Sequence, residues 1–260
     1  MGEREFDERF AGLFGERWPG LRAALLEPGD SVDFGDGLLE PYRLDSASVV
    51  AAKALRLPES GEILDACAAP GGKSLVIGSR MGQGTRMLCN ELSSDRRRRL
   101  SDVLDRHLSP GTRSRVTVSG FDAAAAGGRV CERGRFAAIL LDAPCSSERH
   151  VLKDASALGA WMPARIKFLS RRQWSLLSSA FLLLAPGGSL VYATCALSPE
   201  ENDSPVRRLF EKYGDDALLD PLPDADGAER TVYGVHYLPD RAAGAGPLYV
   251  ARVTKRPTAG

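Results

Sequence analysis

The sequence predicts an α/β protein whose sheet is mostly parallel and doubly wound, with an antiparallel pair of strands at one edge. From about residue 44 onward, short apolar runs typical of buried strands alternate with stretches at helical spacing, as in strand–helix–strand units. A turn rich in glycine joins the first core strand to its helix, as in sheets that bind a ligand at their carboxyl edge. The last two apolar runs are joined by the short loop 242–247, which favours antiparallel pairing.

The N-terminal part is predicted to be helical and then irregular. Residues 3–26 carry phenylalanine and leucine side chains at a helical spacing, which predicts one or two short helices. Residues 27–41 are rich in Gly and Asp, and we expect a loop or a short strand pair there. Residues 1–41 are therefore interpreted as an N-terminal extension, and residues 42–260 as the main domain.

The core elements follow in a regular order. The expected helices span residues 46–55, 72–81, 94–107 and 164–185. The seven expected strands span residues 62–66, 86–91, 115–119, 136–142, 189–194, 235–238 and 248–253. Another helix is expected to begin at Ser198, because Ser198 is a suitable N-cap, Pro199 suits the first helical position and Glu201 completes a capping box.

Composition narrows the classes of function. The 34 basic and 34 acidic residues cancel, whereas a dedicated nucleic-acid binder usually shows a basic excess. No apolar run reaches the roughly 18 residues of a membrane helix. Five cysteines without close pairing indicate reduced thiols in a cytoplasmic compartment. The three histidines are scattered and no CxxC occurs, so we predict no metal site.

Residues 65–74 form a turn that favours a cofactor without a diphosphate. The tail of the turn is similar to a phosphate loop, but Cys67 stands where that motif has glycine. Glu91 ends the next strand about 20 residues later, where a Rossmann-type sheet places a carboxylate on a ribose. Asp122 and Asp142 follow two later strands. Such acids suit an adenosine-containing cofactor with cationic groups, and S-adenosylmethionine fits. The alternative is that these acids only cap the following turns and helices.

Cys145 and Cys195 each stand just after an apolar run that predicts a buried strand. The carboxyl ends of parallel strands border the ligand crevice, and a thiolate there is a strong nucleophile once its pKa is lowered. Spacing does not decide which of the two is the nucleophile. The alternative is that the two cysteines are buried as small hydrophobic residues. We interpret the thiols of Cys67, Cys89 and Cys131 in this way.

Three blocks of residues are similar to a known enzyme family. They are Cys67-Ala-Ala-Pro-Gly-Gly-Lys73, Asp142-Ala-Pro-Cys145 and Thr194-Cys-Ala-Leu-Ser-Pro-Glu-Glu-Asn202. Together they resemble the Nop/Sun (Fmu-type) RNA 5-methylcytosine methyltransferases, in the family's order, over about residues 42–255. The resemblance implies a Rossmann-like class I methyltransferase domain that acts on rRNA or tRNA. The segment Ser146–His150 most resembles the short branch that includes the mitochondrial ribosomal RNA enzyme.

The resemblance also implies roles for single residues. Cys195 would add to carbon 6 of cytosine, and Cys145 would assist product release. Asp142 would lie against the cytosine edge and near the cofactor, and Lys73 between cofactor and base. Glu91 would bind the ribose and Asp122 would face the adenine amine. The full set of implied cofactor contacts is Cys67, Ala68, Ala69, Pro70, Gly71, Gly72, Lys73, Glu91, Arg96, Asp122 and Asp142.

The cationic residues are weaker signals. The run 96–99 cannot form one helix face, because consecutive helical residues point about 100° apart. Candidate RNA contacts lie near the Cys145 loop, and they are Arg149, His150, Arg165, Lys167 and Arg171. The alternatives are a solvated charged face and, for His150, a structural hydrogen bond. The target base must leave any stack to reach the thiols.

Two further hypotheses compete with RNA cytosine methylation. One is a ribosome-assembly or RNA-binding factor on the same fold, with catalysis secondary. The other is a small-molecule or protein methyltransferase, which has no need for two paired cysteines. The matched region carries no RNA-binding module, so we expect the N-terminal segment or a protein partner to supply RNA affinity.

Overall fold

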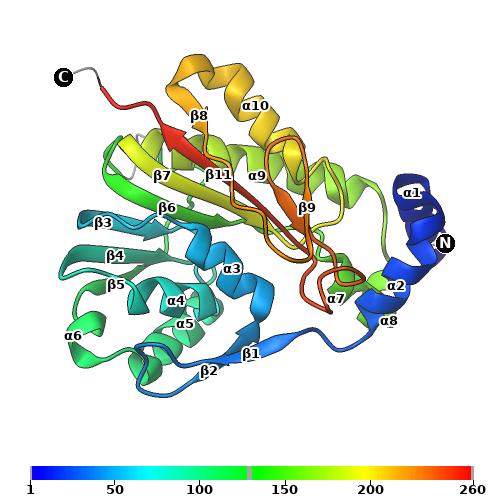
Figure 1. Cartoon of the computed structure of the whole chain (residues 1–260), viewed down its shortest axis with the longest axis horizontal. Coiled ribbons are helices and arrows are strands. Elements are labelled where there is room, and N and C mark those ends of the chain that lie inside the picture. The colour runs from blue at the N-terminus through cyan, green and yellow to red at the C-terminus, as the bar shows by residue number, and fades with distance from the viewer. Residues whose placement is uncertain (1, 128–130, 259–260) are drawn as a thin grey trace.

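A mixed sheet, in which five neighbouring strands run parallel, organises the molecule (Figure 1). The computed structural model describes residues 2–127 and 131–258. Within them, the sheet has nine strands in the order β5-β4-β3-β6-β7-β11-β10-β9, with β8 paired to β11. The strands are β3 (Ser60–Asp65), β4 (Gly84–Asn90), β5 (Val116–Ser119), β6 (Phe136–Asp142), β7 (Leu184–Thr194), β8 (Ala217–Leu219), β9 (Ala228–Arg230), β10 (Val235–Tyr237) and β11 (Leu248–Lys255).

The parallel strands place their carboxyl ends side by side. Strand β6 lies between β3 and β7, and Ile139 pairs with Leu64 on one side and with Leu190 on the other. Because Asp65 pairs with Leu140, and Asp142 with Ala193, the chain leaves all three strands at one edge of the sheet. The expected antiparallel edge is confirmed: β11 pairs antiparallel with both β7 and β10.

Helices cover both faces of the sheet. Successive residues of a strand point to opposite faces, so each strand contributes apolar side chains to two separate cores. The side with Ile63 packs against α3 (Ser46–Ala54), α4 (Gly72–Ser79) and α5 (Ser94–His107). The side with Leu64 packs against α9 (Ala164–Leu183) and α10 (Asp203–Tyr213). The short helix α6 (Pro110–Arg113) precedes β5. This doubly wound arrangement is the fold class that the alternating elements predicted.

The N-terminal helices share a third apolar core with the segment that follows Cys145. Helices α1 (Gly2–Phe14) and α2 (Trp18–Leu26) lie against α7 (Glu148–Lys153) and α8 (Ala155–Gly159) at one end of the molecule (Figure 1). This core contains Phe6, Phe10, Trp18, Leu21, Leu25, Val151, Leu152, Leu158 and Trp161. The chain then forms a hairpin of β1 (Ser31–Phe34) and β2 (Tyr42–Asp45), which carries the chain toward the turn after β3.

The structure corrects three expectations about elements. The sheet has nine described strands instead of seven, because β8 and β9 are three-residue strands without a clear sequence pattern. Helix α9 ends at Leu183 rather than at residue 185. The helix expected from Ser198 begins only at Asp203, and residues 199–202 form turns. Glu201 is buried and its carboxylate accepts hydrogen bonds from Ser146 and Gln173, so it is not used as a cap.

Residues 2–127 and 131–258 contain neither a membrane-spanning helix nor a cluster of metal ligands. None of the helices there is both long and apolar enough to cross a bilayer. No group of three or more His, Cys, Asp or Glu side chains in these ranges has the arrangement of a metal site.

Candidate active site

Three cavities with shared walls lie at the carboxyl edge of the parallel strands. The first, about 250 Å³, is bounded by β2, the 67–73 turn and Asp142. The second, about 540 Å³, shares Cys67 with the first. The third, about 420 Å³, contains Cys195 and shares Lys73 and Asp142 with the first. A molecule that occupies the first two cavities therefore lies next to one that occupies the third.

The turn after β3 is held by buried polar contacts. The Asp65 carboxylate is 1% exposed and accepts a 2.6 Å hydrogen bond from the Ser74 hydroxyl. Burial raises the pKa of Asp65 to about 7. Gly71 has φ +122°, and a Cβ there would lie 3.0 Å from Val103, so glycine is needed for both conformation and packing. Gly71 thus packs the turn against α5, and residues 67–70, 72 and 73 line the first cavity.

The second cavity has a buried carboxylate on one wall. Glu91 is 4% exposed and accepts a 2.9 Å hydrogen bond from the backbone N–H of Ser93. The Arg96 guanidinium lies 3.3 Å from the Glu91 carboxylate and donates to the carbonyl of Ala69 at 2.8 Å. Arg96 therefore links the ends of β3 and β4. Apolar side chains of Leu92, Phe121, Ala123, Leu169 and Leu176 complete the walls, which suits a flat aromatic ring.

Two further side chains shape this cavity, and sequence reasoning did not place them there. Asn90 donates to the carbonyl of Phe121 at 3.0 Å and accepts from its N–H at 3.0 Å, which fixes the start of the loop after β5. Arg172 pairs with Asp122, and this hydrogen bond lowers the pKa of that carboxyl. Arg172 lies on α9 next to the candidate RNA contact Arg171, but it lines this cavity. The available signal in the sequence was the charge of Arg172 next to the side of the predicted helix that faces the core.

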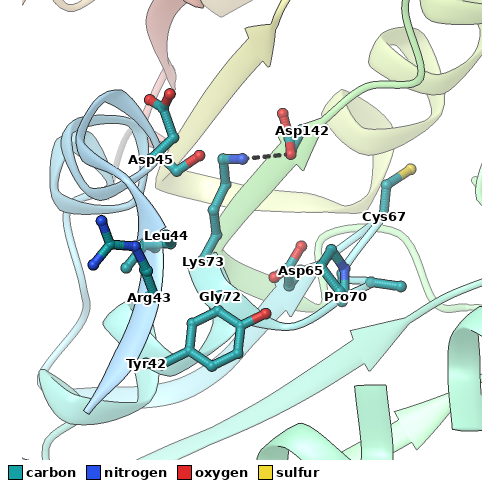
Figure 2. A pocket seen from close by; sticks show the side chains of 13 residues that line it. Tyr42, Arg43, Leu44, Asp45, Asp65, Cys67, Pro70, Gly72, Lys73 and Asp142 are labelled. Atoms are coloured by element: carbon teal, nitrogen blue, oxygen red, sulfur yellow. Dashed lines mark hydrogen bonds and ion pairs between the residues drawn. The ribbon is translucent and has the colours of Figure 1, made fainter. Parts of the chain in front are cut away.

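Lys73 and Asp142 form an ion pair between the first and third cavities. The Lys73 Nζ lies 2.7 Å from Asp142 Oδ2, and Figure 2 shows the ammonium directed at this carboxylate. Burial alone would lower the pKa of Lys73, but the attraction of Asp142 outweighs it and the pKa is raised. Lys73 is therefore a stable cation, and it comes from the first turn of α4 while Asp142 ends β6.

The two cysteines meet beside the third cavity, which Cys195 lines. Their sulfur atoms are 2.9 Å apart, and the backbone N–H of Cys195 donates to Cys145 Sγ at 3.3 Å. The hydrogen bond from the Cys145 thiol lowers the pKa of Cys195, with help from the Ser147 hydroxyl and against burial. The same hydrogen bond, with burial, raises the pKa of Cys145. The arrangement favours a thiolate at Cys195 and a thiol at Cys145, an asymmetry that spacing could not predict.

A buried pair of carboxyl groups, Glu148 and Glu201, connects the segment after Cys145 with the segment after Cys195. The Ser146 hydroxyl lies within hydrogen-bond distance of both Glu148 and Glu201, and Glu148 also accepts from the Leu197 N–H at 3.0 Å. Gln173 donates to Glu201 at 2.9 Å. Burial, then repulsion from Glu201, raises the pKa of Glu148 to about 7. Sequence reasoning missed this pair, since the two residues are far apart in the chain and Glu201 suited a capping box.

The structure separates the candidate RNA contacts. His150 is exposed and lines the third cavity. Arg165, Lys167 and Arg171 are exposed on the N-terminal half of α9. Arg149 has another role: its guanidinium donates to the carbonyls of Ala24, Leu25, Gly244 and Gly246.

With five donor contacts to backbone carbonyls, Arg149 joins α2 to the loop before β11. It therefore leaves our set of RNA contacts. The run 96–99 is divided as expected: Arg96 faces the turn after β3, Arg97 donates to the Glu91 carbonyl, and Arg98 pairs with Asp95.

Known proteins resemble this chain in sequence. The family described as 16S rRNA methyltransferase RsmB/F matches residues 52–254. Ribosomal RNA small subunit methyltransferase F of Klebsiella pneumoniae (strain 342) is 39% identical over 196 residues, which are 75% of this chain and 40% of that relative. The chain thus spans less than half of this relative's length.

Solved structures resemble it in fold. PH0851 superposes with a TM-score of 0.82 at 22% identity, over 96% of this chain and 65% of that one. NSun6 from Pyrococcus horikoshii with SFG gives a TM-score of 0.69 at 26% identity, over 85% of this chain and 54% of that one. These likenesses and the sheet order confirm the expected Rossmann-like class I methyltransferase fold. Because the family match covers most of its length, the chain belongs to the RsmB/F family of rRNA methyltransferases.

Proposed function

We propose that the chain is an S-adenosylmethionine-dependent rRNA (cytosine-5) methyltransferase. The observation that carries the proposal is the contact between the Cys145 and Cys195 sulfurs, 2.9 Å apart, beside a cavity that Cys195 lines and that shares the Lys73–Asp142 pair with the cavity of the glycine turn. A nucleophilic thiolate and a site for a methyl donor are thus separated by a single ion pair. Methylation of a pyrimidine through a covalent adduct needs this combination.

The residues around the first two cavities fit the cofactor of this family, S-adenosylmethionine. Glu91 would hold the ribose hydroxyls and Asp122 would lie near the adenine amine. Asp65 and Asp142 line the first cavity, where carboxylates suit the cationic amino acid end of the molecule. The remaining expected contacts come from the backbone and side chains of residues 67–73 and from Arg96. When bound, the cofactor supplies the methyl group.

The side chains of this chain then divide the work on the base. The Cys195 thiolate bonds to carbon 6, which makes carbon 5 nucleophilic. Asp142 and Lys73 hold the polar edge of the base and offset the charge that develops on it. After methylation, the proton on carbon 5 must leave and the bond from Cys195 to carbon 6 must break.

We assign this release to Cys145. The strongest influence that raises the pKa of Cys145 is its hydrogen bond to Cys195. Once Cys195 is bonded to carbon, it is no longer a thiolate, and this influence is removed. Cys145 is then a stronger acid than in the free protein. After losing its own proton to water, its thiolate would accept the carbon 5 proton and become a thiol again, while the electrons of the carbon 5–hydrogen bond expel Cys195 as a thiolate.

Substrate, partners and organisation complete the proposal. The relatives named ribosomal RNA small subunit methyltransferase F support a small-subunit rRNA substrate. Arg165, Lys167 and Arg171 would contact its phosphates and His150 the target nucleotide. The segment 146–150 supports a place near the mitochondrial-type branch. Residues 1–41 would act as an extension of the catalytic domain 42–260, and a protein partner would add RNA affinity. The five free cysteines support a cytoplasmic, reducing location.

The test combines cysteine variants with labelled cofactor and small-subunit rRNA. Cys195→Ala should abolish transfer to cytosine, and Cys145→Ala should accumulate a covalent protein–RNA adduct, because release is blocked. Cys131→Ala, which changes a buried cysteine that lines none of the three cavities, should behave as the unchanged protein. Transfer that survives in Cys195→Ala would remove its assigned role. Tight rRNA binding without turnover by the unchanged protein would favour an assembly or RNA-binding factor instead.

A further inference from the structure

Ser147 contacts both active-site thiols. Its hydroxyl oxygen lies 3.1 Å from Cys195 Sγ and 3.5 Å from Cys145 Sγ. The carbonyl of Cys145 is 3.4 Å away, which is long for a hydrogen bond between two oxygens. The Cys195 sulfur is therefore the best-placed acceptor for the hydroxyl proton.

The backbone of Ser147 adopts a conformation that favours glycine. It has φ +55° and ψ +58°, and Ser147 and Ala243 are the non-glycine residues with positive φ in the described ranges. A side chain in this region is disfavoured because its Cβ crowds the backbone. A serine is thus kept at a position where glycine would fold more easily, which indicates that its side chain is needed.

The hydroxyl is also turned away from its usual partner. Ser147 occupies the N-cap of α7, where a serine side chain commonly accepts from a backbone N–H of the first turn. Here it makes no such hydrogen bond. The side chain lines the third cavity together with Cys195, so its polar group is directed to the thiols and the cavity instead of to the helix.

We propose that Ser147 is a positioning residue that donates a hydrogen bond to the Cys195 thiolate and orients it toward the third cavity. This inference rests on the proposed function only in taking Cys195 as the nucleophile. Two donors then hold the sulfur, the thiol of Cys145 and the hydroxyl of Ser147. The charged groups that influence Cys195 are Lys73, Asp142 and Glu148.

The test measures the reactivity of Cys195 without RNA or cofactor. Iodoacetamide alkylation of each cysteine is followed by peptide mass spectrometry across a pH series. Ser147→Ala removes the hydroxyl and keeps a Cβ at the strained position. Ser147→Gly removes the hydroxyl and relaxes the backbone. Ser175→Ala is the matched control, because Ser175 lies exposed on α9 and donates only to its own helix. A thermal melt of each variant checks that the fold is retained.

We expect both Ser147 variants to raise the pH midpoint of Cys195 alkylation by about one unit, which is the size of one hydrogen bond to a charged group. At neutral pH the alkylation rate then falls about tenfold, because the thiolate fraction falls by that factor. Methyl transfer should slow through kcat, with KM for RNA unchanged, and should recover as the pH is raised. Ser175→Ala should match the unchanged protein in each measurement.

Three outcomes would overturn the inference. An unchanged midpoint in Ser147→Gly would show that the hydroxyl does not stabilise the thiolate. A shift in Ser147→Gly alone, with Ser147→Ala unchanged, would assign the effect to the backbone. A loss of transfer through KM alone would assign Ser147 to RNA binding. If the unchanged protein transfers no methyl group at all, the proposed function fails, whereas the alkylation profile still decides the role of Ser147.

Discussion

Replacement of Glu148 by glutamine should stabilise the protein, and increasingly so as the pH rises. Glu148 is fully buried beside a second carboxyl, Glu201, and shares Ser146 with it. Two carboxylates at this separation cannot both ionise without a large cost. Glutamine has nearly the same shape, accepts from the Leu197 N–H with its oxygen, and donates to Ser146 with its nitrogen. The substitution therefore removes the charge and keeps the hydrogen bonds.

The magnitude follows from the pKa of Glu148, which is raised from 4.5 to about 7. The folded protein holds the proton more tightly than the unfolded chain does. This contribution to stability is complete below pH 4.5 and is lost as the pH rises through 7. Each pKa unit corresponds to about 1.4 kcal/mol, so ionisation costs roughly 3 kcal/mol at high pH. The advantage of Glu148→Gln should grow by roughly 2 kcal/mol between about pH 5 and 8.

The assay is urea unfolding of both proteins at several pH values, with the difference in unfolding free energy plotted against pH. The difference removes the contributions of other titrating groups. Glu59→Gln, at an exposed position, is the control and should give a small difference that does not vary with pH. A constant difference for Glu148→Gln between pH 5 and 8 would refute the reasoning, since it would show that Glu148 is ionised in the fold throughout.

Four other substitutions test separate parts of the structure. Arg149→Met should lower the unfolding free energy by about 2–4 kcal/mol, because buried carbonyls lose their donors, and should leave the salt dependence of rRNA binding unchanged. Lys167→Gln should leave stability unchanged and reduce the slope of log binding constant against log salt concentration for rRNA by about 1. If Arg149→Met changed this slope and Lys167→Gln lowered stability, the roles of the two residues would be exchanged. Glu91→Gln should weaken S-adenosylmethionine binding at least tenfold in calorimetry, and equal affinity would remove Glu91 from the cofactor site. Burial lowers the pKa of His236 to about 4, so the unchanged protein should lose stability as the pH falls from about 6.5 toward 4, by up to about 3 kcal/mol more than His236→Gln. Parallel acid-unfolding curves would contradict this.

Local sequence was sufficient where each element carries its own signal. The strands ending at Asp65, Asp142 and Thr194 were expected from their apolar residues, and they are neighbours in the sheet. The glycine turn was recognisable because the residues that let a backbone approach a ligand are adjacent in the chain. The start of α10 was misplaced, because the capping pattern at Ser198 is local, whereas Glu201 is engaged by residues more than 25 positions away.

The sequence by itself determined the α/β class, the family resemblance and the set of residues at the strand ends. The succession of strands and helices along the chain and the spacing of motifs are both properties of neighbouring residues. Only the tertiary structure decided how those residues divide their roles. The unequal pKa shifts of Cys145 and Cys195 depend on a 2.9 Å contact and on Ser147. Arg149 became a structural donor because α2 and the loop before β11 close around it. Proton affinity and hydrogen bonding depend on distances across the fold, and no local pattern records them.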